Sequence, residues 1–528
     1  MLSFTAMNTK RLLILTTLLM FFCLLPTFAQ EGTRLEAEDA SYTNCKLVTG
    51  NQYSGKKALE LTEGDASITF HYSASERGKY DVYVGYDALY GAKMVNLSVN
   101  GNSISFQVNG QQESPVGTFI MNEGTNTVII TPNWTWFRID YIRIERNTES
   151  LPFNIPEHPV DSLATDAALE MYAFLCDNFG KKTISGMMTG DMTTANGNVT
   201  RHADIQAVYK VSGKYPALVG FDFMNATGLY ESDNWSKSYT SAAMSLARDT
   251  YRRGGFPNFT WHWRDPSRKT DAFYSSDCSV KVSDAFNDDG SWNTSSALYK
   301  NIIEDIDVIA DHFLALQKAN IACIFRPLHE ASGGWFWWGR EGAHSFVKLY
   351  RLLFDEMVNV KGVHNVIWVW NAGENDDEWN PGDRYYDVVS ADIYNEAFDY
   401  SSCYATFEKL KSLTEGKRII ALSENGPIPD IDREFDEEAV WSWWMPWYQT
   451  WDGNFVNKTS SEEWTKCMND SRVVTLDDLS AGWGQTAISP PESEYDDSHI
   501  LYDLLGRRIT TVPSKGIYIK GDKKLLVP

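Results

Sequence analysis

The stretch Ile321-Ala-Cys-Ile-Phe-Arg-Pro-Leu-His-Glu330 joins an apolar run to a polar end. Its first five residues are all apolar and include isoleucine and phenylalanine, as is typical of a buried β-strand. The residues that follow carry the guanidinium of Arg326, the imidazole of His329 and the carboxylate of Glu330. Reactive side chains directly after a buried strand indicate that its carboxyl end opens into a functional site.

Seven other segments share this strand pattern, and stretches with helical periodicity, such as 298–316 and 345–357, lie between several of them. The seven candidates begin at Thr183, Ala217, Phe256, Val366, Val388, Ile419 and Trp441. Eight strands that alternate with helices favour an eight-fold β/α barrel, or TIM barrel, over residues 161–484. A doubly wound sheet is the competing fold, but no glycine-rich phosphate loop follows the first strand.

The N-terminal part of the chain follows a different pattern. Runs such as 67–72 are rich in β-branched and aromatic residues, and Asn-Gly pairs at 100–101 and 109–110 mark turns between such runs. Short strands at this spacing predict an all-β sandwich of the jelly-roll type over residues 32–147. Residues 148–160 contain three prolines and predict a linker, so the protein is expected to be multidomain.

Residues 1–29 are predicted to be a signal peptide. Lys10 and Arg11 supply its positive charge, residues 12–25 form its apolar region, and Thr27-Phe-Ala29 resembles a small-residue cleavage site. The mature chain is therefore expected to be exported, with no membrane span left after cleavage. The six cysteines beyond this segment are scattered without metal-binding spacing, and their pairing cannot be deduced.

The composition narrows the class of ligand. The chain has 528 residues, with 70 acidic against 47 basic side chains and a net charge of -23, which disfavours nucleic acid as a partner. Aromatic residues make up 13% of the chain and include 19 tryptophans. Tryptophan on an acidic chain suits a neutral ligand with hydroxyl groups and flat apolar faces, and sugars fit that description.

Two glutamates end predicted barrel strands. Glu330 follows the fourth strand and Glu424 follows the seventh, so both should point into one cavity at the carboxyl ends of the strands. Glycoside hydrolysis needs such a pair, about 5–5.5 Å apart in retaining enzymes and about 6.5–9.5 Å apart in inverting ones. A metal site formed by His262, His329 and the carboxylates is an alternative that the ligand spacing does not support.

The segment Phe325-Arg-Pro-Leu-His-Glu-Ala-Ser-Gly-Gly-Trp-Phe-Trp-Trp-Gly339, together with Trp261-His262 and Ser423-Glu-Asn-Gly426, resembles glycoside hydrolase family 26. The resemblance covers about residues 161–484. It implies a β/α barrel and the activity of most members of that family, which are retaining endo-β-1,4-mannanases. It implies that Glu330 is the general acid/base and Glu424 the nucleophile, with no cofactor for catalysis. The remaining substrate-binding residues that it implies are His262, His329, Trp335, Tyr394, Trp447 and Arg326.

The N-terminal domain resembles a carbohydrate-binding module of family 35 or the related family 6. The resemblance rests on Leu35-Glu-Ala-Glu-Asp-Ala40 and on Trp136-Phe-Arg-Ile-Asp-Tyr-Ile142. It implies a structural Ca²⁺ held by Glu36, Glu38 and Asp140, and a sugar-facing Trp134 or Trp136. Carboxylate oxygens at the two ends of a sandwich are ligands of the kind that calcium prefers.

The C-terminal end follows a second predicted linker at residues 485–498. Residues 499–528 predict a small β element, and Tyr502-Asp-Leu-Leu-Gly-Arg-Arg508 with Lys515-Gly-Ile-Tyr-Ile-Lys520 resembles a sorting segment of type IX secretion. This resemblance implies that the protein is secreted or reaches the cell surface.

The expected function is that of an exported, monomeric, retaining endo-β-1,4-mannanase acting on mannan, galactomannan or glucomannan. Three alternatives stay open: a mixed-linkage glucanase or xylanase, an exo enzyme that releases mannobiose, and a non-catalytic glycan-binding surface protein. The sequence does not decide whether the cleft is open along its length, which backbone is preferred, or what the module binds.

Overall fold

The computed structural model describes residues 32–373, 376–448 and 455–479, together with four short strands between residues 501 and 527. The predicted signal peptide, residues 1–29, lies outside the described residues, as do the predicted linker 485–498 and residues 503–507 and 515 of the segment that resembles a sorting signal. Among the helices that the structure describes, none is both long and apolar enough to cross a membrane.

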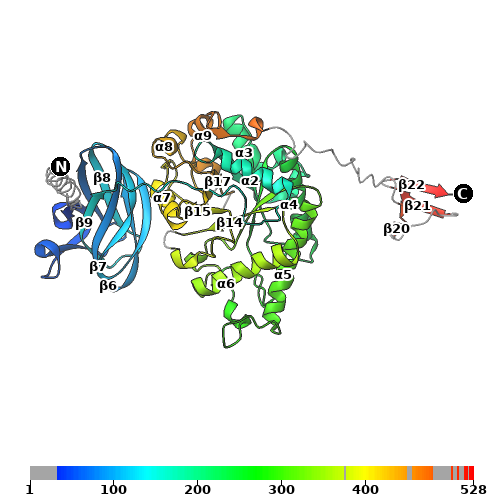
Figure 1. The fold of residues 1–528 in the computed structure, drawn as a ribbon, viewed down its shortest axis with the longest axis horizontal. Coiled ribbons are helices and arrows are strands. Elements are labelled where there is room, and N and C mark those ends of the chain that lie inside the picture. Colours follow the sequence, from blue (N-terminus) through cyan, green and yellow to red (C-terminus); the bar gives the residue numbers. More distant parts are fainter. Residues whose placement is uncertain are drawn as a thin grey trace, which may run out of the picture. The chain divides into compact units, whose positions relative to one another are not determined.

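The N-terminal domain is the predicted all-β module. Its strands are β1 (Thr33–Glu36), β2 (Ser41–Thr43), β3 (Cys45–Thr49), β4 (Lys57–Leu61), β5 (Ser67–Ala74), β6 (Gly78–Val99), β7 (Asn102–Met121), β8 (Gly124–Pro132) and β9 (Phe137–Arg146). The first part of β6 pairs with β9 and its last part pairs with β8, so the long β6–β7 hairpin belongs to both layers of a sandwich. Figure 1 shows these strands wrapped around one interior.

The module's core follows from alternation along its strands. On β9, Ile142 and Ile144 point inward, whereas the neighbouring Tyr141 and Arg143 are only partly buried. The inward side chains join one buried cluster that also includes Ala405 of the second domain. Polar contacts accompany this packing, since Arg77 bonds Asp436 at 2.6 Å.

The second domain is the predicted eight-fold β/α barrel. Its strands are β10 (Thr183–Met188), β11 (Leu218–Asp222), β12 (Phe256–Trp261), β13 (Cys323–Pro327), β14 (Val366–Asn371), β15 (Val388–Ile393), β16 (Ile419–Asn425) and β17 (Trp443–Pro446). Each strand pairs in parallel with the next, and β17 pairs with β10, which closes the barrel. The short β18 (Val473–Val474) adds to β10 from outside this ring.

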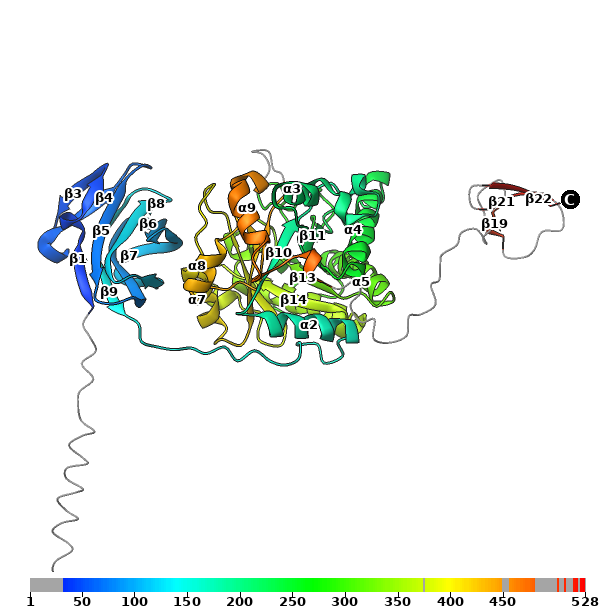
Figure 2. The same ribbon diagram turned by 90° about the horizontal axis from the view of Figure 1, so that it is seen from above.

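Helices surround these strands (Figures 1 and 2). They are α2 (Asp166–Asn178), α3 (Ala203–Ser212), α4 (Asn234–Arg252), α5 (Ala297–Gln317), α6 (Ala343–Phe354), α7 (Tyr404–Leu413), α8 (Ile431–Asp436) and α9 (Ser461–Met468). The strands are covered on both faces, which explains why they read as continuous apolar runs rather than as alternating ones. The predicted fold class is thus confirmed for both domains.

The C-terminal segment forms a separate unit from Gly482 onward. Its described strands are β19 (Leu501–Tyr502), β20 (Arg508–Ile509), β21 (Gly516–Lys520) and β22 (Lys523–Val527), paired in the antiparallel order β20-β19-β21-β22.

Close packing inside the barrel depends on glycine at Gly186 of β10. A Cβ atom there would lie 2.5 Å from the backbone oxygen of Trp444. We expect Gly186→Ala to destabilise the barrel by about 1–3 kcal/mol, because the backbone must shift to make room. Thermal unfolding measures the loss, and Gly64→Ala, whose Cβ would meet no atom within 4 Å, is the matched control. Equal midpoints for the two variants would contradict this account.

Candidate active site

A buried arginine joins two carboxylates at the carboxyl ends of the barrel strands. Arg326 of β13 is 0% exposed. It donates to Asp392 of β15 at 2.7 Å and also to Glu424 of β16. Burial alone would lower the pKa of Arg326, but the negative charges of Asp392 and Glu424 raise it above its ordinary value.

Glu424 has a second donor. The Tyr394 hydroxyl lies 2.5 Å from its other carboxylate oxygen. Burial, with the negative charge of Glu424, raises the pKa of Tyr394 well above its usual range, so the phenol stays protonated and keeps donating. Both oxygens of Glu424 therefore accept hydrogen bonds, one from Arg326 and the other from Tyr394, and these donors fix the orientation of the carboxylate.

Glu330 lies just beyond β13 in an unusual backbone conformation, with φ at 52°. Its backbone N–H donates to the side-chain oxygen of Asn371, at the end of β14, at 2.7 Å. Asn371 also donates to Asp392 at 2.9 Å, which links Glu330 to the arginine network. Left-handed backbone is costly for a residue with a side chain, and here the neighbouring strand fixes it and aims the carboxylate.

The carboxyl group of Glu330 is tuned toward the protonated form. Burial, followed by the negative charge of Glu424, raises its pKa to about 7. The indole N–H of Trp335 donates to Glu330 at 2.9 Å and acts in the opposite direction, because it stabilises the charged form. Glu330 and Glu424 are thus two carboxyl groups with different environments in one cavity.

The two glutamates lie close together. One oxygen from each of Glu330, Asp392 and Glu424 lies within 4.8 Å of the others. This proximity fits the shorter of the two carboxylate separations used in glycoside hydrolysis, about 5–5.5 Å. The cation that joins Asp392 to Glu424 in this structure is Arg326, and the alternative of a metal site with His262 and His329 stays a prediction.

His262 follows β12 and is held by Asp222 at the end of β11. Its Nδ1 lies 2.6 Å from one Asp222 oxygen, and its backbone N–H donates to the other at 3.1 Å. Burial opposes charge on the ring, but Asp222, with a contribution from Glu424, raises the pKa of His262. The pair fixes the ring orientation and leaves Nε2 as the nitrogen free to face a ligand.

His329 is buried beside His262, with ring centres 4.6 Å apart. Its Nδ1 lies 3.3 Å from the Thr260 hydroxyl. Burial, Arg326 and His262 all lower the pKa of His329 well below its ordinary value, so this ring is neutral. The site therefore places His262, an imidazole with a raised pKa, beside His329, an imidazole with a lowered pKa.

Aromatic side chains border these groups. Trp335 is 47% exposed and Tyr394 is 45% exposed, although their polar ends bond the two glutamates. Trp447 follows β17, and its ring centre lies 5.9 Å from that of His262. The structure thus brings together all eight residues that the sequence singled out in the barrel.

Three further residues of the site were missed at the sequence level: Asp222, Asn371 and Asp392. Each stands at or near the carboxyl end of its strand, which was the available signal. A carboxylate or amide at the end of a strand does not by itself reveal its partner, so the pattern alone gave these residues no role.

The module carboxylates gather at one edge of the sandwich. Glu36 accepts from the Ser54 hydroxyl at 2.7 Å, and Asp140 accepts from the Ser54 backbone N–H at 3.1 Å. One oxygen each of Glu36, Glu38 and Asp140 is buried without a hydrogen-bond partner. Burial and the charges of the two glutamates raise the pKa of Asp140 to about 6.

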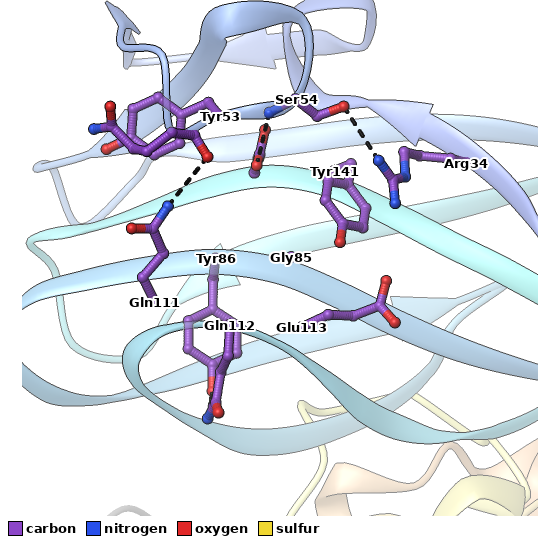
Figure 3. A pocket seen from close by; sticks show the side chains of 11 residues that line it. Arg34, Tyr53, Ser54, Gly85, Tyr86, Gln111, Gln112, Glu113 and Tyr141 are labelled. Carbon is purple, nitrogen blue, oxygen red and sulfur yellow. Dashed lines mark hydrogen bonds between the residues drawn. The ribbon is translucent and has the colours of Figure 1, made fainter.

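A polar pocket of about 310 Å³ opens beside these carboxylates. Figure 3 shows Arg34, Tyr141 and Glu113 around it, with Ser54 at the upper edge. Trp134 and Trp136 do not line this pocket. They are 55% and 50% exposed in the loop between β8 and β9, where Trp136 packs edge-on against Tyr90 with ring centres 6.0 Å apart.

Comparison with known proteins assigns each of the two domains to a family. The family model "Glycosyl hydrolase family 26" matches residues 160–478, and "Carbohydrate binding module (family 35)" matches residues 33–147. A mannan endo-1,4-beta-mannosidase of Thermothelomyces thermophilus is 32% identical over 473 residues, which cover 86% of this chain and 91% of that protein. A mannan endo-1,4-beta-mannosidase B of Piromyces sp is 31% identical, with 87% and 80% covered.

Solved structures similar to this chain agree with this family assignment. A Podospora anserina GH26-CBM35 β-(1,4)-mannanase is 28% identical, with a TM-score of 0.55 over 85% of this chain and 98% of that one. A β-mannanase from a symbiotic protist of the termite Reticulitermes speratus, complexed with gluco-manno-oligosaccharide, is 36% identical, with a TM-score of 0.55 over 62% and 99%. The chain is therefore a glycoside hydrolase that belongs to glycosyl hydrolase family 26 and carries a family 35 carbohydrate-binding module.

Proposed function

We propose that this protein is a retaining endo-β-1,4-mannanase, with Glu330 as general acid/base and Glu424 as nucleophile. The observation that carries the proposal is the pair itself: oxygens within 4.8 Å, one carboxyl with a pKa near 7 and the other paired with Arg326 and Tyr394. A protonated acid and an ionised nucleophile at this separation are what double displacement requires.

In the first step Glu424 attacks the anomeric carbon while Glu330 gives its proton to the leaving glycosidic oxygen, which breaks the glycosidic bond and forms a glycosyl ester. In the second step Glu330, now a carboxylate, takes a proton from water, and that water displaces Glu424. Arg326 and Tyr394 hold Glu424 in place for attack and receive it back as a carboxylate. The configuration at the anomeric carbon is inverted twice and so retained.

The other residues of the site position the sugar. His262, oriented by Asp222, and neutral His329 present ring nitrogens to hydroxyl groups. Trp447 forms the platform for the sugar whose bond to the next unit is broken, and Trp335 borders the leaving-group side through its contact with Glu330. Indole faces suit the apolar face of a pyranose ring.

The relatives support mannan as the substrate and internal cleavage as the mode, since both curated proteins named above are mannan endo-1,4-beta-mannosidases. Glucomannan falls within the same proposal, because the termite-symbiont structure holds a gluco-manno-oligosaccharide. The protein acts as a monomer, since the described site draws every residue from one barrel.

The module increases the local concentration of polysaccharide near the barrel. Trp134 and Trp136 are its sugar-facing residues, and their exposure supports this role. A structural Ca²⁺ binds Glu36, Glu38 and Asp140, whose unpartnered buried oxygens suit a cation.

The protein is exported. The predicted signal peptide and the type IX-like segment support secretion or attachment at the cell surface. A polysaccharide too large to enter a cell must be cut outside it, which agrees with this location.

The main test incubates the mature protein with unbranched mannan, galactomannan, glucomannan, mixed-linkage β-glucan and xylan. We expect mixed-length oligosaccharides from the mannans, with the β-anomer appearing first by NMR, and no hydrolysis by Glu424→Ala. Mannobiose alone would overturn the endo mode, and activity confined to glucan or xylan would overturn the substrate. Binding without hydrolysis of any glycan would show a non-catalytic protein.

The pH dependence follows from Glu330, which must be protonated to act. Its pKa is raised to about 7, so kcat/KM should fall as pH rises through about 7. Trp335→Phe removes a hydrogen bond that lowers this pKa, so the basic limb of the profile should move to higher pH. Trp292→Phe is the control, since Trp292 packs on Phe286 and Tyr299. A shift to lower pH in Trp335→Phe would contradict the assignment.

Calcium should raise the thermal midpoint of the module and a chelator should lower it. Saturation at 100 times the dissociation constant stabilises by about 2.7 kcal/mol. Because the pKa of Asp140 is about 6 without a cation, the effect should be full at pH 7.5 and weak at pH 5. Asp140→Asn should lose it, while Asp39→Asn, an exposed neighbour, should keep it. No calcium response in the unaltered protein would remove the cation from the proposal.

A further inference from the structure

The loop between β11 and α4, together with the first turn of α4, exposes three large apolar side chains at the catalytic end of the barrel. Leu229 is 41% exposed, Tyr230 is 59% exposed and Trp235 is 53% exposed. Single exposed apolar residues are common on protein surfaces and need no explanation. Three exposed apolar residues within the seven from Leu229 to Trp235 do need an explanation, because the loops after barrel strands carry the active sites of barrel enzymes.

This loop is firmly anchored. Arg264 donates to the backbone oxygen of Met224 at 2.7 Å, to the side-chain oxygen of Asn225 at 3.0 Å and to Asp271 at 2.6 Å. Gly228, with φ at 109°, lets the loop pass so close that a Cβ atom would lie 2.9 Å from the Arg264 side chain. A fixed loop can hold an aromatic ring in one place at little entropic cost on binding.

Trp235 contacts a buried tyrosine that lies near residues of the proposed active site. Trp235 packs on Tyr239, with ring centres 5.4 Å apart. Tyr239 is buried near Asp222 and Tyr448, whose charges contribute to its raised pKa. Tyr448 in turn contacts Trp447, with ring centres 5.1 Å apart.

The start of α4 determines where Trp235 lies along the barrel axis. Asp233 caps α4, since its side chain accepts from the Ser236 backbone N–H at 2.7 Å, so Trp235 lies in the first turn. Tyr239 lies four residues further along the helix, about 6 Å deeper along its axis. Helices that follow barrel strands begin at the catalytic end, so Trp235 lies at the rim above the buried Tyr239.

We propose that Trp235, with Tyr230 beside it, forms a distal subsite that stacks one neutral hexose of the same polysaccharide chain. This inference rests on the proposed function. A half-exposed indole ring, held in the first turn of α4 against Tyr239, suits the apolar face of a pyranose.

The test compares substrates of increasing length. We expect Trp235→Ala to lower kcat/KM on mannohexaose about tenfold, mainly through KM, and to leave kcat/KM on an aryl mannobioside unchanged. Trp235→Phe should restore most of the loss, because it keeps an aromatic face. The positions at which mannohexaose is cut should also shift, since one binding register loses its contact.

Tyr209→Ala is the matched control, because Tyr209 is 39% exposed on α3 and stacks on Tyr215. It should leave every substrate unaffected. An equal loss on all lengths would show that Trp235 only supports the fold, and no loss on any length would overturn the subsite. If the unaltered protein cleaves glucan instead of mannan, the proposed function fails on substrate, and the same length series with cello-oligosaccharides decides the subsite.

Discussion

The ion pairs of Arg326 are the interaction on which the active site depends. A guanidinium with no solvent exposure is stable only if carboxylates surround it, and here Asp392 and Glu424 do so from two other strands. Asn371 extends the network by joining Asp392 to the backbone of Glu330. One buried charge thereby sets the relative positions of side chains from four strands or strand ends.

The same network makes the two glutamates different. Glu424 accepts from the guanidinium of Arg326 and from the Tyr394 hydroxyl, whereas Glu330 accepts from the Trp335 indole N–H and faces the charge of Glu424. Two chemically identical groups thus have different surroundings, and those of Glu330 raise its pKa to about 7, which is how a single cavity can hold an acid and a nucleophile. Asp222 acts in a similar way on His262, so the site's protonation pattern is built from buried pairs.

The sequence predicted the barrel because buried parallel strands are continuous apolar runs, and it predicted Glu330 and Glu424 because both follow such runs. It could not predict that Asp392 pairs with Arg326, since that contact depends on the register of β13 against β15 across β14. Nor could it give the left-handed backbone at Glu330, which is held by a side chain 41 residues further along the chain. Contacts between side chains of different strands depend on how the barrel closes, and no local sequence pattern predicts that closure.

The loops behave differently from the strand ends. Barrel geometry brings the end of every strand to one cavity, so chemistry placed there tolerates little change in position. A loop such as the one from Phe223 to Asp233 is free of that constraint, and Arg264 fixes it by bonds to its own neighbours rather than to the catalytic carboxylates. Residues in such a loop can therefore alter how much of a polysaccharide is held without altering how its bond is broken.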